Sequence, residues 1–117
     1  MTTQMPESEY EQLAGVTIEA IEAALDAAAE ATDLDIDVQM KPGGVLELEF
    51  DDGSKIIVNR QAPMREIWVA ARSGGFHFRH VEGRWCDTRD GSELFAALSR
   101  LVSAQSGVAV ILAPRQT

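Results

Sequence analysis

The stretch VNRQAPMREIWVAA, residues 58–71, decides how the sequence folds. Both of its ends read as β-strands, and the Ala62-Pro63 pair between them ends the first strand, because proline has no N–H to donate to a strand ladder. Side chains alternate between the two faces of a strand, so Trp68 cannot enter the same core as its neighbours Ile67 and Val69. We therefore expect Ile67 and Val69 to face the interior and Trp68 to lie on the other face of the sheet, largely accessible to solvent.

Short β-strands continue on both sides of this stretch. The alternation of apolar and polar residues predicts six strands, over residues 33–38, 45–51, 55–61, 66–72, 76–81 and 84–87. The connections are tight turns, among them the hairpin signal Asp52-Gly53. Strands joined by tight turns pair with their neighbours in the sequence, so the six strands should form one antiparallel meander.

A helix is predicted before the strands and another after them. The first covers about residues 7–31, with Ser8 as its expected N-cap and Glu11 at the capping-box position three residues later. The second should begin after Asp90, which is its expected N-cap, with Glu93 as the partner in the capping box. Each helix has one apolar stripe that needs a surface to bury it.

The economical packing places both helices on one face of the sheet. The predicted fold class is therefore α+β, a two-layer α/β sandwich in which an antiparallel sheet of about six strands carries the N- and C-terminal helices on one face. The core should consist of Ile18, Ile21, Leu25, Leu46, Leu48, Phe50, Ile67, Val69, Leu94, Leu98 and Leu101. The apolar tail at residues 108–112 should pack back against the helices or add a short strand.

Composition and charge narrow the class of protein. The 117 residues, 45% of them hydrophobic, suit one domain, taken to span residues 1–117. We expect no membrane span, since no stretch of 18 or more apolar residues occurs, and no targeting peptide, since the start MTTQMPESEYEQ is polar and acidic. The one cysteine, Cys86, cannot close an intrachain disulfide, which favours a cytoplasmic location. The net charge of −9 argues against a nucleic acid partner and favours cations or a basic protein surface.

One face of the first helix is lined with carboxylates that recur at helical spacing, nearly opposite the apolar stripe. With two aspartates that follow the helix, they make up an acidic ridge of Glu19, Glu22, Asp26, Glu30, Asp33 and Asp35. Like charges four residues apart destabilise a helix by about 0.2–0.5 kcal/mol per pair. A helix that retains such repulsion concentrates negative potential in one region.

Two interpretations of the acidic ridge are open. Carboxylate oxygens suit iron and other hard cations such as Mn²⁺, Mg²⁺ and Ca²⁺, and binding should be weak and exposed because no loop encloses the ion. The other interpretation is that the ridge is only the solvated face of a helix.

Trp68 is also open to two interpretations, a protein-contact site or a residue that only covers the sheet. The hairpin across Pro63 should bring Asn59 or Gln61 near it on the open face, and His77 should point to the same side. Because tryptophan is enriched at interface hot spots, this cluster is a candidate protein-contact site. The alternative is a tryptophan that merely covers the sheet.

Several motifs resemble the signature of the frataxins. They are Asn59-Arg60-Gln61-Ala62-Pro63 followed by Ile67-Trp68-Val69-Ala70, then Gly74-Gly75-Phe76-His77-Phe78, then Trp85-Cys86-Asp87 leading into Arg89-Asp90-Gly91. With the helix–strands–helix order and the acidic first helix, the resemblance covers nearly the whole chain. The absence of an organellar extension points to the bacterial type. The first helix departs from the pattern in its alanines at positions 23, 27, 28 and 29, where relatives often carry more acidic residues.

The resemblance implies a regulatory role in iron–sulfur cluster assembly and no enzymatic activity. Frataxins bind iron weakly through an acidic ridge on the first helix and adjoining strand, and they dock on the cysteine desulfurase and its scaffold protein and modulate the rate. By this resemblance, the acidic ridge would bind the metal, and Asn59, Gln61 and Trp68 would contact the partner.

Two other functions compete with this one. The first is an iron chaperone that donates Fe(II) to the scaffold. The second, a ferroxidase or an iron-storage enzyme, ranks last, because a di-iron site needs histidines within a helix bundle and the chain has only His77 and His80, both outside the predicted helices.

Overall fold

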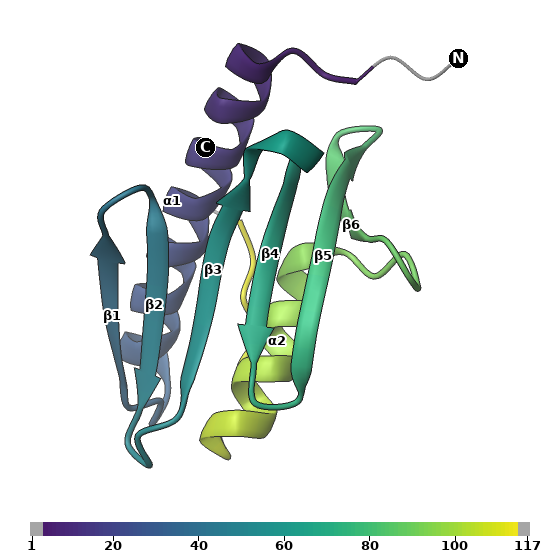
Figure 1. Ribbon diagram of the computed structural model, residues 1–117. Coiled ribbons are helices and arrows are strands. Elements are labelled where there is room, and N and C mark those ends of the chain that lie inside the picture. The colour runs from purple at the N-terminus through teal and green to yellow at the C-terminus, as the bar shows by residue number, and fades with distance from the viewer. Residues whose placement is uncertain (1–3, 115–117) are drawn as a thin grey trace.

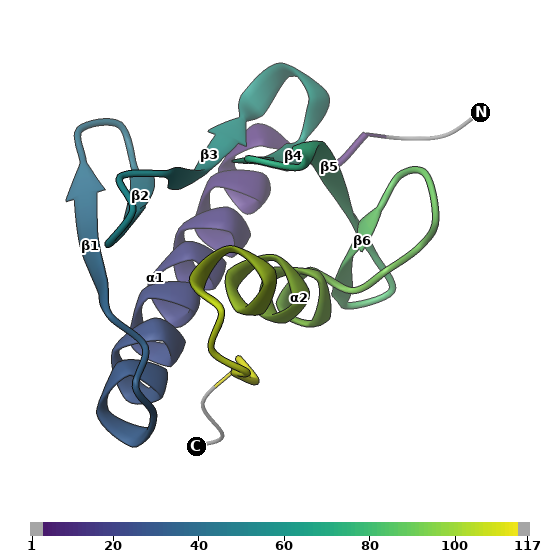
Figure 2. The ribbon, with the colours of Figure 1, turned by 90° about the horizontal axis from the view of Figure 1, so that it is seen from below.

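The computed structural model describes residues 4–114, and both of its helices cover the same face of one sheet (Figures 1 and 2). The elements follow the order α1 (Glu7–Ala31), β1 (Ile36–Lys41), β2 (Val45–Phe50), β3 (Lys55–Gln61), β4 (Glu66–Ala71), β5 (Gly74–Val81), β6 (Arg84–Asp87) and α2 (Leu94–Ser106), with the short 3-10 turn η1 (Ala62–Met64) before β4. The strands lie in sequence order, each antiparallel to the next. The predicted α+β sandwich is confirmed.

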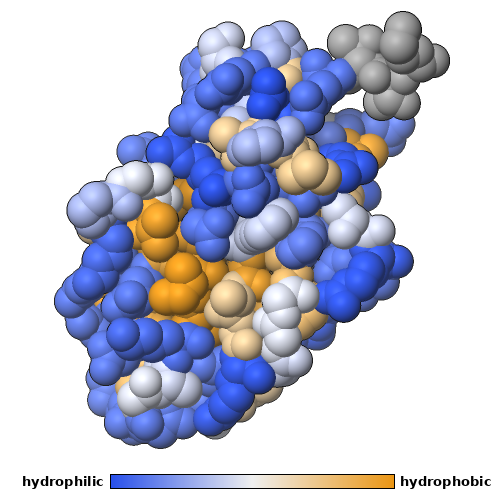
Figure 3. Space-filling model, in the orientation of Figure 1, coloured by the Kyte–Doolittle hydropathy of each residue, from blue (hydrophilic) through white to orange (hydrophobic). Residues whose placement is uncertain are grey.

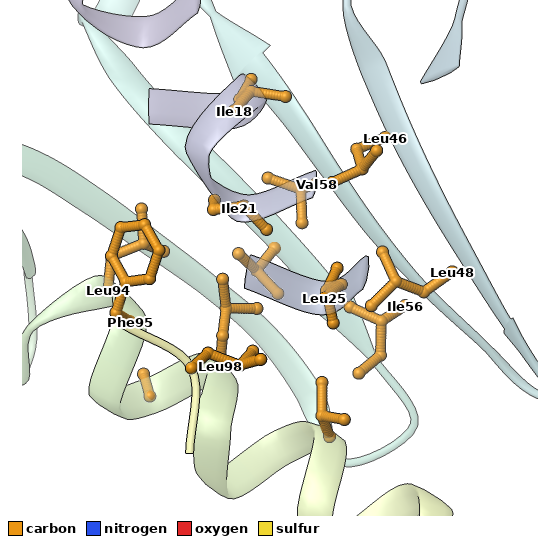
Figure 4. Packing of buried hydrophobic residues seen from close by; sticks show 14 of the residues in the cluster. Ile18, Ile21, Leu25, Leu46, Leu48, Ile56, Val58, Leu94, Phe95 and Leu98 are labelled. Atoms are coloured by element: carbon orange, nitrogen blue, oxygen red, sulfur yellow. The ribbon is translucent and has the colours of Figure 1, made fainter. Parts of the chain in front are cut away.

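The core lies between the helix layer and the sheet. Figure 4 shows side chains of α1, α2 and the central strands pointing toward one another in this layer. The predicted core residues are buried, with the exception of Leu101, which is half-buried and packs against the others. Burying one large aliphatic side chain contributes about 1.5–3 kcal/mol, so this layer fixes which face of each strand points inward.

The bounds of α1 agree with the prediction, but its N-terminal cap differs. The helix begins at Glu7, with Pro6 as N-cap and no side-chain capping hydrogen bond, so the expected capping box of Ser8 and Glu11 was wrong. The carbonyl of Pro6 accepts the first helical bond, from the N–H of Tyr10. Proline at this position already has a fixed φ compatible with the chain entering a helix, and it lacks an N–H that would need a partner.

The start of α2 also differs. The expected N-cap, Asp90, instead accepts a hydrogen bond from the N–H of Ser92 within a turn, and this bond lowers the pKa of its carboxyl. The helix begins at Leu94, and Glu93 is its N-cap, accepting from the N–H groups of Phe95 and Ala96. The residue expected as the capping-box partner, Glu93, is thus the N-cap itself.

β1 begins at Ile36, three residues later than predicted. Thr32 ends α1, and its hydroxyl oxygen accepts a hydrogen bond from the N–H of Leu34, so this segment is a turn. The side chain of Leu34 is nevertheless buried. The turn leaves Asp33 and Asp35 exposed beside the C-terminal end of the helix.

The tail after α2 packs back on the helices and forms no strand among the described residues. Three serines of α2 bond to its backbone in place of a strand: Ser106, Ser103 and Ser99 accept from the N–H groups of Val108, Val110 and Leu112. The spacing of three and four residues puts these hydroxyls on one side of the helix, facing alternate residues of an extended chain. Val110 and Leu112 are thereby buried.

Candidate functional site

The face of the sheet without helices carries a row of three side chains across β3, β4 and β5. The strand register pairs Asn59 with Trp68 and Trp68 with His77. The indole and imidazole rings are stacked, with centroids 4.2 Å apart and planes 9° apart. The predicted placement of His77 beside Trp68 is confirmed.

A second row runs beside the first. It pairs Gln61 with Glu66, Glu66 with Arg79, and Arg79 with Cys86. Glu66 Oε1 accepts a 2.8 Å hydrogen bond from Trp68 Nε1, and Glu66 Oε2 accepts a 2.7 Å bond from Arg79 Nη2. These two rows define the Trp68 face, which comprises Asn59, Gln61, Glu66, Trp68, His77 and Arg79.

The three predicted contact residues, Asn59, Gln61 and Trp68, therefore lie together on one face. The expectation that Trp68 is largely accessible was wrong, because its side chain is half-buried. The stacked imidazole covers one side of the ring, and the bond to Glu66 holds its edge. In the orientation of Figure 1, Figure 3 shows a hydrophobic area over the middle of this open face, bordered by hydrophilic residues.

The turn between β3 and β4 is held from outside the sheet. Arg65 adopts a left-handed backbone conformation, with φ of 55°, and its Nε donates to the carbonyl of Met5. Gln4 Nε2 donates to the carbonyl of Pro63. These contacts tie the segment before α1 to the turn, so the strands that carry Asn59 and Trp68 meet in a fixed register.

The acidic ridge lies at the other end of the sheet, beside β1 (Figure 1). Glu19, Asp26, Glu30, Asp33 and Asp35 are exposed, and Glu22 is half-buried. In residues 4–114, no three side chains among His, Cys, Asp and Glu converge as ligands for one metal ion. The residues therefore fit a cation held at the surface by one or two carboxylates, with water completing its shell.

Three further carboxylates join this acidic region through the strand register. Asp35 and Asp37 line a shallow depression of about 360 Å³ together with Glu49 and Asp51 of the neighbouring hairpin. Asp37 is directly opposite Glu49 across the β1–β2 ladder. The sequence showed the alternation in each strand but gave no register between them, so Glu49 and Asp51 were not recognised as neighbours of the ridge.

Neither α1 nor α2, the helices of the described part of the chain, combines the length and the apolar character needed to cross a membrane.

Comparisons with known proteins agree with this architecture. The model of the frataxin-like domain matches residues 3–108. The iron-sulfur cluster assembly protein CyaY of Cupriavidus pinatubonensis is 58% identical over 108 residues, which cover 92% of this chain and 96% of the relative. The protein of the same name from a Janthinobacterium species is 56% identical over 109 residues, covering 92% and 96%.

Solved structures give the same result. Frataxin from Psychromonas ingrahamii matches with a TM-score of 0.75 at 32% identity, covering 92% of this chain and 97% of that one. Trimeric frataxin from Saccharomyces cerevisiae, complexed with ferrous iron, matches with a TM-score of 0.69 at 26% identity, covering 92% and 91%. The chain therefore belongs to the frataxin family and is of the CyaY type.

Proposed function

We propose that this chain is an iron-binding regulator of iron–sulfur cluster assembly, which docks on the cysteine desulfurase and its scaffold protein and modulates them in response to iron. The names of its close relatives support the pathway, since they are iron-sulfur cluster assembly proteins. The yeast relative complexed with ferrous iron supports the choice of metal. In this role the chain is a cytoplasmic binding module without a catalytic residue of its own.

The observation that carries the proposal is the separation of two surfaces of the molecule, one on the first helix and one on the sheet. The acidic ridge lies along α1 and the turn before β1, while the Trp68 face lies on β3, β4 and β5 (Figure 1). One surface can therefore bind cations or a basic surface while the other contacts a protein. A module with two independent surfaces can couple iron level to docking.

The acidic ridge supplies the response to iron. Its exposed carboxylates should bind Fe²⁺, Fe³⁺ and other hard divalent cations with affinity on the order of micromolar or weaker, because no cage encloses the ion. The same carboxylates should attract a basic surface of the desulfurase, and this attraction should weaken with salt. Bound iron partly neutralises the ridge, so iron and the partner compete for it unless the metal bridges them.

Two alternatives remain to be separated from this proposal. An iron chaperone would use the same ridge to deliver Fe(II) to the scaffold. A ferroxidase or storage enzyme receives no support from the residues described, since His77 stacks on Trp68 and His80 packs edge-on against Trp85. Both histidines lie far along the chain from the ridge, on β5.

The deciding experiment measures sulfide production by the cognate desulfurase, with and without this protein, across an iron titration. A regulator changes the rate even when the scaffold is left out, and the change depends on iron. A chaperone changes only cluster formation on the scaffold. If the protein alters neither sulfide production nor cluster formation at any iron level, the proposal is wrong.

A ridge variant tests the role of the carboxylates. Glu19→Gln, Glu22→Gln and Asp26→Asn together should weaken both metal binding and desulfurase association, while slightly raising the melting temperature of the metal-free protein. The matched control replaces three exposed carboxylates off the ridge, Glu7, Glu9 and Glu82, by glutamine and so removes the same charge. If the two variants behave alike, net charge matters and the ridge itself does not.

A further inference from the structure

Glu66 is buried on a face of the sheet that no helix covers. Its residue exposure is 2%, and among the described residues it is one of two buried charged side chains, the other being Asp87 on the helix side. A carboxylate loses its hydration when buried and stays charged only if it is paired and hydrogen-bonded. The side chains that cover Glu66 therefore have to replace the lost hydration with hydrogen bonds and an opposite charge.

Both oxygens of Glu66 are used by the Trp68 face itself. One accepts from the indole N–H of Trp68 and the other from the guanidinium of Arg79. His77 Nδ1 lies 3.9 Å from the oxygen that the indole uses. Charge-assisted bonds of this length are stronger than neutral ones, and two of them fix the positions of two different contact groups.

The arrangement turns the carboxylate inward and the guanidinium and imidazole donors outward. The Glu66 side chain is 3% exposed, whereas those of Arg79 and His77 are 55% and 48% exposed. A partner that approaches this face meets the free N–H groups of a guanidinium and an imidazole beside the indole, and it does not meet the carboxylate.

The segment of sequence around Trp68 also carries more positive than negative charge. Residues 53–89, which include β3 to β6, carry seven basic and three acidic side chains, and two of those acids, Glu66 and Asp87, are buried. Residues 7–52 carry fourteen acidic side chains and one basic one. In a chain of net charge −9, the segment that contains Trp68 is thus rich in basic side chains, and Arg79 is the one that the strand register places beside Glu66 on the Trp68 face.

We infer that Glu66 is the positioning residue of the Trp68 face, and that the face it organises receives an acidic patch of a partner protein. The inference rests on the proposed function for the identity of the partner, which is the scaffold or the desulfurase. Positioning matters because side chains held in their bound geometry lose less entropy on association. The sign of the partner's patch follows from charge complementarity across an interface.

The positioning role is tested without any partner. The protein has two tryptophans, and the indole N–H of Trp85 has a different partner, Thr17 Oγ1 of α1, on the helix side of the sheet. In ¹H–¹⁵N spectra, Glu66→Gln should move the Trp68 indole resonance upfield and leave that of Trp85 in place. Asp87→Asn is the matched control, since it neutralises the other buried carboxylate and should leave the Trp68 resonance unchanged. An unmoved Trp68 resonance in Glu66→Gln overturns the positioning role.

The sign of the charge on the partner's contact patch is tested by measuring binding to the purified scaffold and, separately, to the purified desulfurase. Arg79→Gln should weaken binding about tenfold and Arg79→Glu more, and Glu66→Gln should weaken it about three- to tenfold with Arg79 in place. Asp87→Asn should bind like the parent chain. Stronger binding by Arg79→Glu than by Arg79→Gln to either protein means a basic partner and overturns the inference. If the parent chain binds neither protein, the proposed function and the partner's sign both fail, and the indole shift alone then decides whether Glu66 positions Trp68.

Discussion

The phenolic hydroxyl of Tyr10 donates a 2.7 Å hydrogen bond to the backbone carbonyl of Glu66. This bond joins the first helix to the strand that carries Trp68, across 56 residues of sequence. Tyr10 is fully buried, and its ring meets Trp85 edge-on at 6.3 Å. The helix layer thus holds the backbone of the same residue whose carboxylate orients the Trp68 face.

Tyr10 should make the protein sensitive to alkali. Burial raises the pKa of its hydroxyl above the ordinary value of 10.0. The unfolded chain therefore loses this proton first as pH rises, so the stability that depends on the neutral hydroxyl is complete below about pH 10 and is lost as pH rises toward the folded-state pKa. Because the chain has one tyrosine, the absorbance of tyrosinate during a pH titration reports it directly.

The matching variant is Tyr10→Phe. It should cost about 1 kcal/mol in free energy of unfolding at neutral pH, through loss of the hydrogen bond to Glu66, and should flatten the decline of stability above pH 10. Chemical denaturation at several pH values measures both effects. A tyrosine that titrates with an ordinary pKa in the folded protein would contradict the burial argument.

Trp68→Ala should cost stability as well as binding. It removes a hydrogen bond to a buried carboxylate and a stacked ring pair, contributions of about 1 kcal/mol each. We expect a loss of about 1–2 kcal/mol in thermal or urea unfolding, together with weaker docking on the assembly complex. Val16→Ala is a suitable control, because Val16 is 60% exposed on α1 and its truncation should change neither quantity. A loss above about 4 kcal/mol would place Trp68 in the core and reverse the face assignment.

Ser103→Ala should loosen the tail behind α2. The hydroxyl of Ser103 both accepts from the N–H of Val110 and donates to its carbonyl, at 3.0 and 3.2 Å. Its removal leaves two backbone groups without this partner and should cost about 1–2 kcal/mol. Limited proteolysis after α2 and hydrogen exchange at Val110 measure the effect. Ser73→Ala, in an exposed turn, is the control, and equal protection of Val110 in both variants would argue against the serine contacts.

Gly44→Ala should be costlier than Gly53→Ala. Both glycines have positive φ, 75° and 86°, so both substitutions carry the cost of a left-handed backbone, about 1–2 kcal/mol. A Cβ at Gly44 would also collide with the guanidinium of Arg60, whereas at Gly53 it meets open space. Arg60 bonds to Glu11 and to the carbonyl of Gly43, so moving it detaches α1 from the β1–β2 turn.

The part of the stability cost of Gly44→Ala that comes from the collision with Arg60 can be isolated in a double-mutant cycle. In an Arg60→Ala background, Gly44→Ala should cost no more than Gly53→Ala, because the collision is gone. Equal costs of the two glycine variants in the parent chain would show that Arg60 shifts freely.

The strands could be predicted from the sequence because apolar alternation decides which face enters the core. That alternation, with the turn at Pro63, was sufficient to place Asn59, Gln61 and Trp68 on one face. The capping residues were mispredicted because several polar side chains near each helix start can cap. In the fold, Glu93 caps α2, and α1 begins after Pro6 without a side-chain cap.

The side-chain hydrogen bonds and charge pairs that depend on the exact strand register were beyond prediction. The burial of Glu66 depends on the register that brings Arg79 opposite it, and on the Trp68 ring folding over it. Glu66 shares the face of Trp68 two residues away, which was the one available signal. The acidic depression at Asp37 and Glu49 likewise depends on a pairing that neither strand encodes alone.

The division of charge between the two ends of the sheet makes the molecule an electric dipole lying in the plane of its strands. The acidic pole is at α1 and β1, and the basic pole is at β4 to β6 (Figure 1). In the field of a large charged complex such a molecule experiences a torque as well as a force, so it rotates into its docking orientation before the surfaces touch. A cation bound at the acidic pole reduces that torque, so iron would change the angle of approach even where it changes no contact.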